Sequence, residues 1–315
     1  MIPAKPVVRN KQDQGLLMRF AIGDAIVDII IDDDDFALPL SQFLPGCDQQ
    51  SIAAHLRMLQ PEFLDLARNL VKFAIQSFVV QVEGRTLLID TCIGENKDCP
   101  EIPAWHQRRG TGFLDRLRRA GVDPGEIDLV FCTHLHVDHV GWNTRRESGR
   151  FEPTFPNARY LFGRRELADW MMQRDAGRAP PIHARALEES VIPIVEAGRA
   201  DLVDDGYDLG PGLRLVPLPG HTIGQMGLVV ERAQDRAIFC GDALHSPVQI
   251  FQPGLSTSVC VDPKVATATR EMIFAEAADS GRRVVPAHFR GQRHTHIRSN
   301  GNGYEPVFAP EPANE

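Results

Sequence analysis

Short apolar runs alternate along the chain with segments in which apolar residues recur at helical spacing. The runs at residues 73–82, 85–90 and 128–133 predict strands, because brief stretches of apolar and β-branched residues between turn residues are typical of buried strands. Residues 111–121 have the apolar spacing of an amphipathic helix, with Gly121 placed to end it. By the same criteria we expect strands at 158–162, 213–217, 225–231, 236–240 and 283–286, and helices at 164–173, 182–197 and 263–280. Strands and helices that interleave in this way, without internal repeats, predict an α/β chain.

The first 72 residues have a pattern of their own. Residues 16–31 are rich in Ile, Val, Phe and Leu and predict one or two strands. The acidic run at residues 32–35 lacks the alternating spacing and the glycine of an EF-hand loop, so we interpret it as a solvated turn. Residues 49–72 have helical spacing that is broken at Pro61, and they predict a helical segment.

Composition narrows the class of protein. The chain has 315 residues, of which 43% are hydrophobic, so it can bury a substantial core. Its net charge of −8 argues against a nucleic-acid-binding surface and for a soluble protein. The start of the chain lacks an apolar signal region and the run at residues 15–31 is broken by charged residues, so we expect neither a signal peptide nor a membrane span. The six cysteines form no CxxC pair, which favours a reducing compartment and a cytoplasmic location.

One stretch, FCTHLHVDHVGW, concentrates side chains that can bind a metal. It contains His134, His136, Asp138 and His139 within six residues, directly after a short apolar run that predicts a strand. A strand that ends in a turn presents consecutive side chains to a cleft, and imidazole nitrogens with carboxylate oxygens suit zinc or a similar first-row metal. Histidines on a solvated polar loop are the alternative. That alternative is disfavoured because polar groups directly behind a buried strand need partners.

The segment HLHVDH resembles the HxHxDH signature of the metallo-β-lactamase-fold hydrolases. That family also needs a lone His, an Asp at a strand end and a last His near the C-terminus, and the matching segments here are PLPGHTIGQMG with His221, IFCGDALH with Asp242 and VVPAHFRG with His288. The segment TLLIDT resembles the strand in which an Asp, here Asp90, supports the metal ligands from behind. The resemblance covers roughly residues 70–290. It implies a four-layer αβ/βα sandwich with the site at one edge of the two sheets.

The resemblance also implies a site for two divalent metal ions, most simply zinc, with manganese, cobalt or iron accepted according to supply. The implied ligands are His134, His136 and His221 for the first metal, Asp138, His139 and His288 for the second, and Asp242 as the bridge. A water shared by two such cations loses its proton near neutral pH, and the resulting bridging hydroxide would attack a carbonyl. Asp138 or His245 would then help to protonate the leaving oxygen. No serine or cysteine nucleophile is required, and no GxSxG, GxGxxG or P-loop pattern is present.

The substrate is harder to predict than the metal site, because different branches of this family hydrolyse different kinds of bond. An Asp at position 242 disfavours a true β-lactamase, the short segment after His288 disfavours a glyoxalase II-type thioesterase, and the acidic composition disfavours a nuclease. The pattern is most similar to the lactonase and methyl parathion hydrolase-like branch. Lactonases of that type carry a Tyr three residues after the bridging Asp, where this chain has His245. His245 either donates a hydrogen bond or proton to the leaving group or packs without a catalytic role.

The sequence therefore predicts a dinuclear metal-dependent hydrolase of a lactone or other carboxylic ester. Three alternatives remain open: a phosphotriesterase-type hydrolase that uses the same site, a non-haem iron redox enzyme of the same fold, and a metal-binding protein without catalysis. The expected partner is a small-molecule ester or lactone, and the resemblance implies a homodimer. We expect one domain over residues 1–298, in which residues 1–72 are an extension whose helical segment lies near the site mouth or a dimer interface, followed by a loose tail over residues 299–315.

Two tryptophans and several histidines are ambiguous in the sequence. Trp105, on a polar loop past Asp90, either walls the substrate pocket or packs against the body, and Trp142 either stacks on substrate or packs. The histidines without motif context are expected to be surface or packing residues: His55, His106, His183, His294 and His296.

Overall fold

Two β-sheets form the centre of the molecule in the computed structural model, which describes residues 18–47, 50, 52–301 and 303–308. Within these residues the first sheet has eight strands in the order β1-β2-β4-β5-β6-β9-β10, with β3 paired to β4. Its strands are β1 (Met18–Ile22), β2 (Ala25–Pro39), β3 (Leu64–Asp65), β4 (Leu70–Val82), β5 (Arg85–Ile89), β6 (Leu129–Phe131), β9 (Arg159–Gly163) and β10 (Ala200–Val203). The second sheet follows chain order through β11 (Asp208–Gly210), β12 (Leu213–Pro217), β13 (Met226–Arg232), β14 (Asp235–Gly241) and β15 (Arg283–Pro286).

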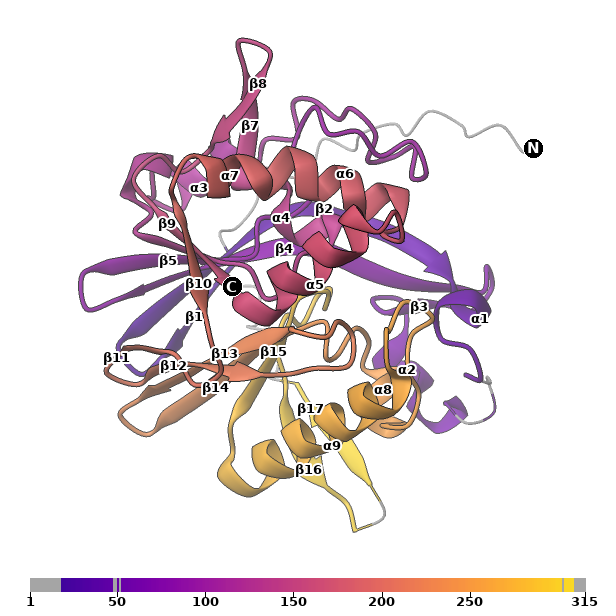
Figure 1. The fold of residues 1–315 in the computed structure, drawn as a ribbon. Helices are drawn as coiled ribbons and strands as arrows, with labels where there is room; N and C mark the ends of the chain where they lie inside the picture. The colour runs from indigo at the N-terminus through magenta and orange to yellow at the C-terminus, as the bar shows by residue number, and fades with distance from the viewer. Residues whose placement is uncertain (1–17, 48–49, 51, 302, 309–315) are drawn as a thin grey trace.

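Helices cover the outer face of each sheet. The helices are α1 (Leu40–Phe43), α2 (Leu56–Leu59), α3 (Phe113–Arg119), α4 (Val137–Val140), α5 (Arg164–Asp175), α6 (Pro181–Ser190), α7 (Ile192–Glu196), α8 (Val248–Phe251) and α9 (Pro263–Ser280), with short 3₁₀ turns η1 (Ala53–His55), η2 (Pro124–Glu126) and η3 (Gly141–Asn143). In Figure 1, α3, α6 and α7 lie above the first sheet and α9 lies below the second. No helix in the described part of the chain is long and apolar enough to cross a membrane.

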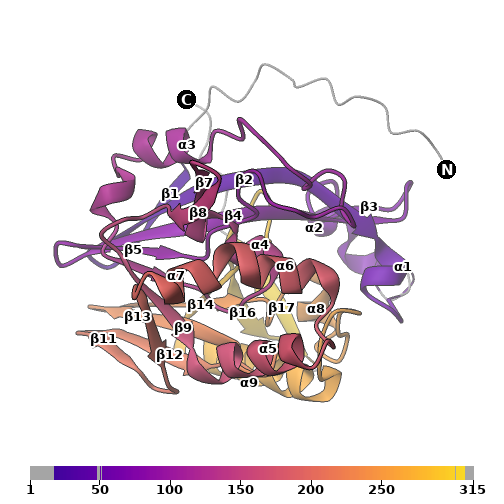
Figure 2. The same ribbon diagram turned by 45° about the horizontal axis from the view of Figure 1, so that its top comes forward.

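Three apolar clusters show why these elements stack in four layers. One cluster fills the space between the sheets, where Phe78 and Phe131 of the first sheet meet Phe239 and Val285 of the second. A second cluster joins the outer face of the first sheet to α3, α6 and α7, and a third joins the outer face of the second sheet to α9. Each sheet therefore buries both faces, one on the other sheet and one on helices. The predicted αβ/βα sandwich is confirmed, and Figure 2 shows α3 and α9 at opposite ends of this stack.

Most of the predicted elements after residue 72 are confirmed. The predicted helix 263–280 and strand 283–286 coincide with α9 and β15, and the predicted helix 111–121 contains α3, with Gly121 following it at φ +83°. These segments have strong local signals, since apolar periodicity and a glycine in the left-handed region fix both the element and its end.

The N-terminal segment differs from two expectations. The acidic run at residues 32–35 lies inside β2, and Asp32 is a buried residue whose carboxylate lies 3.2 Å from Nη1 of Arg108, so the solvated turn was wrong. Within the described residues of the helical segment expected over 49–72, helix is limited to η1 and α2, and the chain then enters β3 and β4. Residues 49 and 51 lie outside the described residues. Pairing of Leu70 with Pro39 and of Val71 with Leu38 extends the long β2–β4 ladder and outweighs the helical periodicity.

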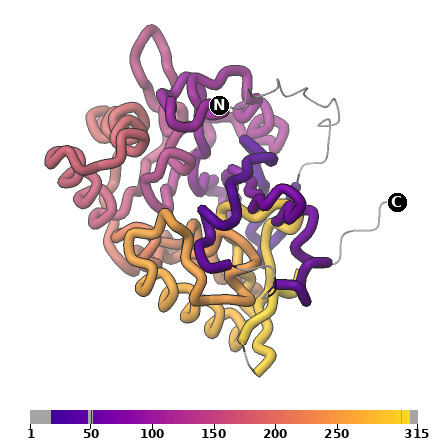
Figure 3. The backbone as a smooth tube through the Cα atoms, turned by 90° about the vertical axis from the view of Figure 1, so that its right-hand side faces the viewer, coloured from indigo at the N-terminus to yellow at the C-terminus, as the bar shows by residue number. Residues whose placement is uncertain are grey.

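The segment after β2 forms one side of the site region. Leu40, Phe43 and Leu44 pack with Val248 and Leu255 from the segment after β14. The backbone N–H of Ser258 donates a hydrogen bond to the carbonyl of Phe43. Figure 3 shows the violet N-terminal segment beside this orange segment.

The C-terminal segment is also more ordered than expected. Residues 304–307 form β17 (Tyr304–Val307), which pairs with β16 (His296–Ser299), and Tyr304 and Phe308 pack against the α9 cluster. The loose tail predicted from residue 299 was therefore wrong for residues 299–301 and 303–308. The rest of that predicted tail, residue 302 and residues 309–315, lies outside the described residues. A second hairpin, β7 (Thr144–Glu147) with β8 (Arg150–Pro153), projects from the outer face of the first sheet.

Candidate metal centre

The ends of four strands meet at one edge of the sandwich. Strands β5 and β6 are parallel in the first sheet, and β14 and β15 are parallel in the second. Because parallel strands end on the same side, the residues that follow them lie close together. Asp90 follows β5, His134 comes three residues after β6, Asp242 follows β14, and His288 comes two residues after β15. The topology thus explains why motifs separated by up to 198 positions converge.

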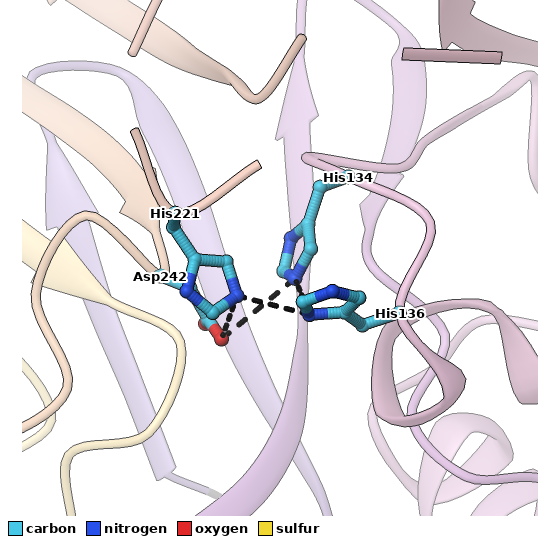
Figure 4. A group of neighbouring side chains, drawn as sticks. All are labelled: His134, His136, His221 and Asp242. Carbon is cyan, nitrogen blue, oxygen red and sulfur yellow. Dashed lines mark hydrogen bonds and ion pairs between the residues drawn. The ribbon is translucent and has the colours of Figure 1, made fainter. Parts of the chain in front are cut away.

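The first group of possible ligands combines three histidines with one aspartate. Their ligand atoms all lie within 4.8 Å of one another. Nδ1 of His136 lies 3.1 Å from Nε2 of His134 and 2.9 Å from Nε2 of His221. Oδ2 of Asp242 lies 3.7 Å from His134 Nε2 and 3.3 Å from His221 Nε2 (Figure 4). His134 and His136 come from the loop after β6, His221 from the loop between β12 and β13, and Asp242 from the end of β14, and all four point toward one shared point.

The second group contains Asp138, His139 and His288, again with ligand atoms within 4.8 Å of one another. Oδ2 of Asp138 lies 3.7 Å from His139 Nε2 and 3.6 Å from His288 Nε2. The other oxygen of Asp242, Oδ1, lies 3.4 Å from His139 Nε2 and 3.0 Å from His288 Nε2. Asp242 therefore faces one group with each of its oxygens, as a bridging carboxylate would.

The chemistry of these donors fits metal ions better than a network of hydrogen bonds. His139 Nε2 and Asp242 Oδ1 are buried without a hydrogen-bond partner among the described residues, which is costly unless something else satisfies them. Burial lowers the pKa of three imidazoles, those of His134, His136 and His221, so that their neutral, metal-binding form prevails. Nitrogen and carboxylate donors in this number suit two zinc-like ions. All seven residues predicted from the sequence are brought together here.

Asp90 holds the metal loop from behind. Its Oδ1 accepts a hydrogen bond of 2.7 Å from the backbone N–H of Thr133, and its Oδ2 lies 2.9 Å from His139 Nδ1. The residue has φ +56°, a left-handed conformation that an aspartate tolerates when its side chain bonds locally. His288 is oriented in the same manner, with Nδ1 2.9 Å from the carbonyl of Ala74. These contacts leave the opposite ring nitrogens, Nε2, to face the shared site.

Glu166 supports both ligand loops and was missed in the sequence. Its buried carboxylate accepts hydrogen bonds from the backbone N–H of Leu135 at 3.2 Å, from that of Gly224 at 3.0 Å and from Trp170 Nε1 at 2.8 Å. Leu135 lies between two ligand histidines, and Gly224 lies three residues after a third. Nothing in the local sequence distinguishes this glutamate from a solvated one in the first turn of α5.

An apolar cavity of about 300 Å³ opens onto the candidate ligands. Five of them line it: His136, Asp138, His221, Asp242 and His288. Its apolar wall consists of Phe36, Leu38, Phe43, Phe73, Ile75, Ile102, Trp105, Val137, Ile182 and Val259. Phe36, Leu38 and Phe43 come from the first 72 residues, so this N-terminal segment forms part of the cavity wall. A small molecule bound in this cavity would place an apolar group against the wall and a polar group at the candidate metal ligands.

His245 lies on the same cavity, beside the bridging aspartate. Its Nε2 is 3.0 Å from Asp242 Oδ2, and its ring meets the edge of Phe43 with centroids 5.4 Å apart. Nδ1 of His245 is buried and has no hydrogen-bond partner in the described part of the chain. The residue is thus placed beside the candidate ligands.

His183 was predicted to be a surface or packing residue, and its place beside a candidate ligand was missed. It lines the cavity and stacks on His136, with ring centroids 4.2 Å apart. The other histidines without motif context lie in packing or polar contacts elsewhere, as predicted: His55 against Phe251, His106 near Asp98, His294 against Phe20 and His296 near Gly281.

The two tryptophans take different positions. Trp142 is buried and stacks on Phe113 with centroids 5.3 Å apart, so it packs and does not reach the cavity. Trp105 both packs against Phe36 and lines the cavity. The two roles considered for Trp105 are therefore compatible.

Comparison with sequence families gives a match over most of the chain. The family model of the Metallo-beta-lactamase superfamily matches residues 71–288. The N-acyl homoserine lactonase AiiB of Agrobacterium fabrum is 24% identical over 273 residues, which are 82% of this chain and 95% of AiiB. An N-acyl homoserine lactonase of Bacillus cereus is 26% identical over 175 residues, which are 52% of this chain and 60% of that enzyme.

Comparison with solved structures gives the same fold. The dizinc quorum-quenching lactonase AidC superposes with a TM-score of 0.76 at 20% identity, over 93% of this chain and 97% of AidC. The hydrolase AbOPH of the β-lactamase superfamily superposes with a TM-score of 0.78 at 22% identity, over 94% of this chain and 98% of that protein. At these identities the superpositions establish the architecture.

Proposed function

The chain belongs to the metallo-beta-lactamase superfamily, and we propose that it is a lactonase, a metal-dependent hydrolase that opens a lactone ring. The observation that carries this proposal is the shared Asp242, which faces three histidines with one oxygen and a second ligand group with the other, at an apolar cavity. The N-acyl homoserine lactonases to which the chain is similar support the lactone as the substrate class. The homodimer and the cytoplasmic location remain predictions.

We assign the ligands to two divalent ions, which we propose to be zinc. The first ion would be held by His134, His136 and His221, the second by Asp138, His139 and His288, and both by Asp242. When bound, such ions activate water as a nucleophile near neutral pH and act as Lewis acids toward a carbonyl oxygen.

The protein's own residues supply binding and proton transfer. The apolar wall around Phe73 and Trp105 would hold the hydrophobic part of the substrate and exclude water from the carbonyl. Ring opening moves one proton, from the attacking water to the leaving alkoxide oxygen. Asp138 and His245 both line the cavity, and Nε2 of His245 lies beside the shared carboxylate. We assign this transfer to His245 Nε2, with the Asp138 carboxylate as the second carrier.

Metal analysis and a substrate panel on the same purified sample test the proposal. We expect about two equivalents of a zinc-like metal per chain, as a two-metal site requires, together with turnover of lactones. His136→Ala should lose both the first metal and the turnover. His55→Ala is the matched control, because His55 stacks on Phe251 and lies outside the cavity lining.

Two results would redirect the assignment. One iron per chain with oxygen uptake and no hydrolysis would move the protein to the redox branch of the fold. Turnover of aryl phosphotriesters without turnover of lactones would favour the phosphotriesterase alternative, in which the same ligands act on phosphorus.

A further inference from the structure

His183 occupies a fixed position on the wall of the cavity. It lies in the first turn of α6, where its backbone N–H donates to the carbonyl of Pro180. Its ring lies nearly parallel to that of His136, at an angle of 24°. Trp170 packs on it as well, with centroids 5.2 Å apart. The ring thus packs against both a candidate metal ligand and a tryptophan.

The polar atoms of this ring have no partner in the protein. Within the described residues, neither ring nitrogen of His183 makes a hydrogen bond, and Nδ1 is buried. A neutral imidazole offers one N–H donor and one acceptor. Buried polar atoms in native proteins are normally satisfied. The missing partner is therefore expected from outside the chain, in the cavity that His183 lines.

The surroundings of His183 single it out. Its neighbours on the cavity wall, Ile182 and Val137, are apolar. Apart from the candidate ligands and His245, two other residues of the cavity lining carry polar side-chain atoms. The carboxylate of Glu101 is already bonded to Arg185, and the buried Nε1 of Trp105 has no hydrogen-bond partner among the described residues. Among the described residues, His183 is thus a polar side chain that stacks on His136 and has no hydrogen-bond partner for its ring nitrogens.

We propose that His183 is a specificity-determining residue that exchanges one hydrogen bond with a polar group of the substrate next to the carbonyl under attack. The inference rests on the proposed lactonase function and deepens it. The enzyme then prefers lactones that carry an amide or hydroxyl at the carbon beside the carbonyl over lactones that carry an alkyl chain there. A site that hydrogen-bonds a polar group discriminates against the analogue that lacks it, because its own polar atoms are left unpaired.

The test compares two lactones and one variant. The substrates are α-(hexanoylamino)-γ-butyrolactone and an α-alkyl-γ-butyrolactone of the same chain length. His183→Phe keeps an aromatic ring on His136 and removes both nitrogens. We expect His183→Phe to lower kcat/KM for the amide lactone roughly tenfold, mostly through a higher KM, because one hydrogen bond is lost. The kcat/KM for the alkyl lactone should change by less than about twofold. The metal content should equal that of the wild type.

Each other outcome overturns the inference. Equal losses on both lactones at normal metal content would mean that His183 only positions His136, and no loss on either would mean that it contacts no substrate. A wild-type protein that hydrolyses neither lactone would instead overturn the proposed function and the inference with it. If His183→Phe does not fold, His183→Gln keeps a donor and an acceptor without the ring. The ratio of kcat/KM between the two lactones should then remain within about twofold of wild type, and its collapse would refute the proposal.

Discussion

Oδ2 of Asp90 lies 2.9 Å from Nδ1 of His139, and the same carboxylate accepts a hydrogen bond from the backbone N–H of Thr133. One side chain thus fixes both the orientation of a candidate ligand and the start of the loop that carries it. All three groups are buried, so solvent does not compete for these bonds. Asp90, which directly follows β5, therefore holds both His139 and the start of the metal loop in position.

Removing this carboxylate should weaken metal binding without removing a ligand. In Asp90→Ala, His139 loses the partner that holds Nε2 toward the site, and we expect zinc affinity to fall about 10- to 100-fold. A competition titration against a chromogenic chelator measures it. Asp123→Ala, on the exposed turn after α3, should leave the affinity unchanged. Equal affinities in wild type and Asp90→Ala would contradict the role assigned to Asp90.

Glu166 should couple the stability of the fold to the site. In Glu166→Leu the N–H groups of Leu135 and Gly224 stay buried and lose their acceptor, which costs about 1–3 kcal/mol each. Urea denaturation of the metal-free protein should show the lower free energy of unfolding. Glu188→Leu on α6 is the control, because the Glu188 side chain is exposed and pairs only with the partly exposed Arg174 among the described residues. Similar losses in the two variants would show that the carboxylate of Glu166 is unimportant.

The candidate site was predictable because its signals are local. His134, His136, Asp138 and His139 share one short segment. Asp242 and His288 each follow a short apolar run that predicts a strand, and they match motifs of the family that the sequence resembles. Parallel pairing then brings these strand ends to one edge.

The errors share a different cause. Asp32 looked solvated because its partner Arg108 is 76 positions away. His183 and Glu166 carry no local signal, since their importance arises from which loops the fold places beside them. Residues 49–72 have helical periodicity, but residues 70–72 pair with β2 and form the start of β4. In each of these cases, contacts between residues far apart in the sequence determine the local structure or the role of the residue.

The buried pair of Asp32 and Arg108 provides a test of such long-range contacts. Arg108→Met leaves the Asp32 carboxylate, whose side chain is fully buried, without its closest cation, and we expect a loss of about 3 kcal/mol in the free energy of unfolding. Arg118→Met is matched to it, because Arg118 and its partners Asp115 and Asp123 are exposed, and it should cost less than about 1 kcal/mol. Equal losses in the two variants, measured by chemical denaturation, would rule out a structural role for the buried pair.

Removal of metal should abolish activity and lower the melting temperature together. The candidate ligands place His136 Nδ1 within 3.1 Å of two other ring nitrogens, an arrangement that an ion stabilises. A ligand present at 100 times its Kd stabilises the folded state by about 2.7 kcal/mol. Dialysis against a chelator followed by calorimetry measures the change, and addition of zinc should restore both activity and melting temperature. In His136→Ala, where the first metal cannot be held, the shift on adding zinc should be smaller. A melting temperature that is insensitive to the chelator in the wild type would argue against bound metal.

The apolar wall should set the length of the hydrophobic group that the enzyme accepts. Leu38 lines the cavity and is only partly buried, so a larger side chain can be placed there without overpacking the core. In Leu38→Trp the added volume occupies space that a long chain needs, and we expect kcat/KM to fall about tenfold for long-chain lactones, equivalent to about one or two lost methylene contacts. Short-chain lactones should be affected less than about twofold. Met272→Trp changes an exposed position on α9 and should alter neither substrate class. A uniform loss across all chain lengths in Leu38→Trp would place the acyl group elsewhere than against this wall.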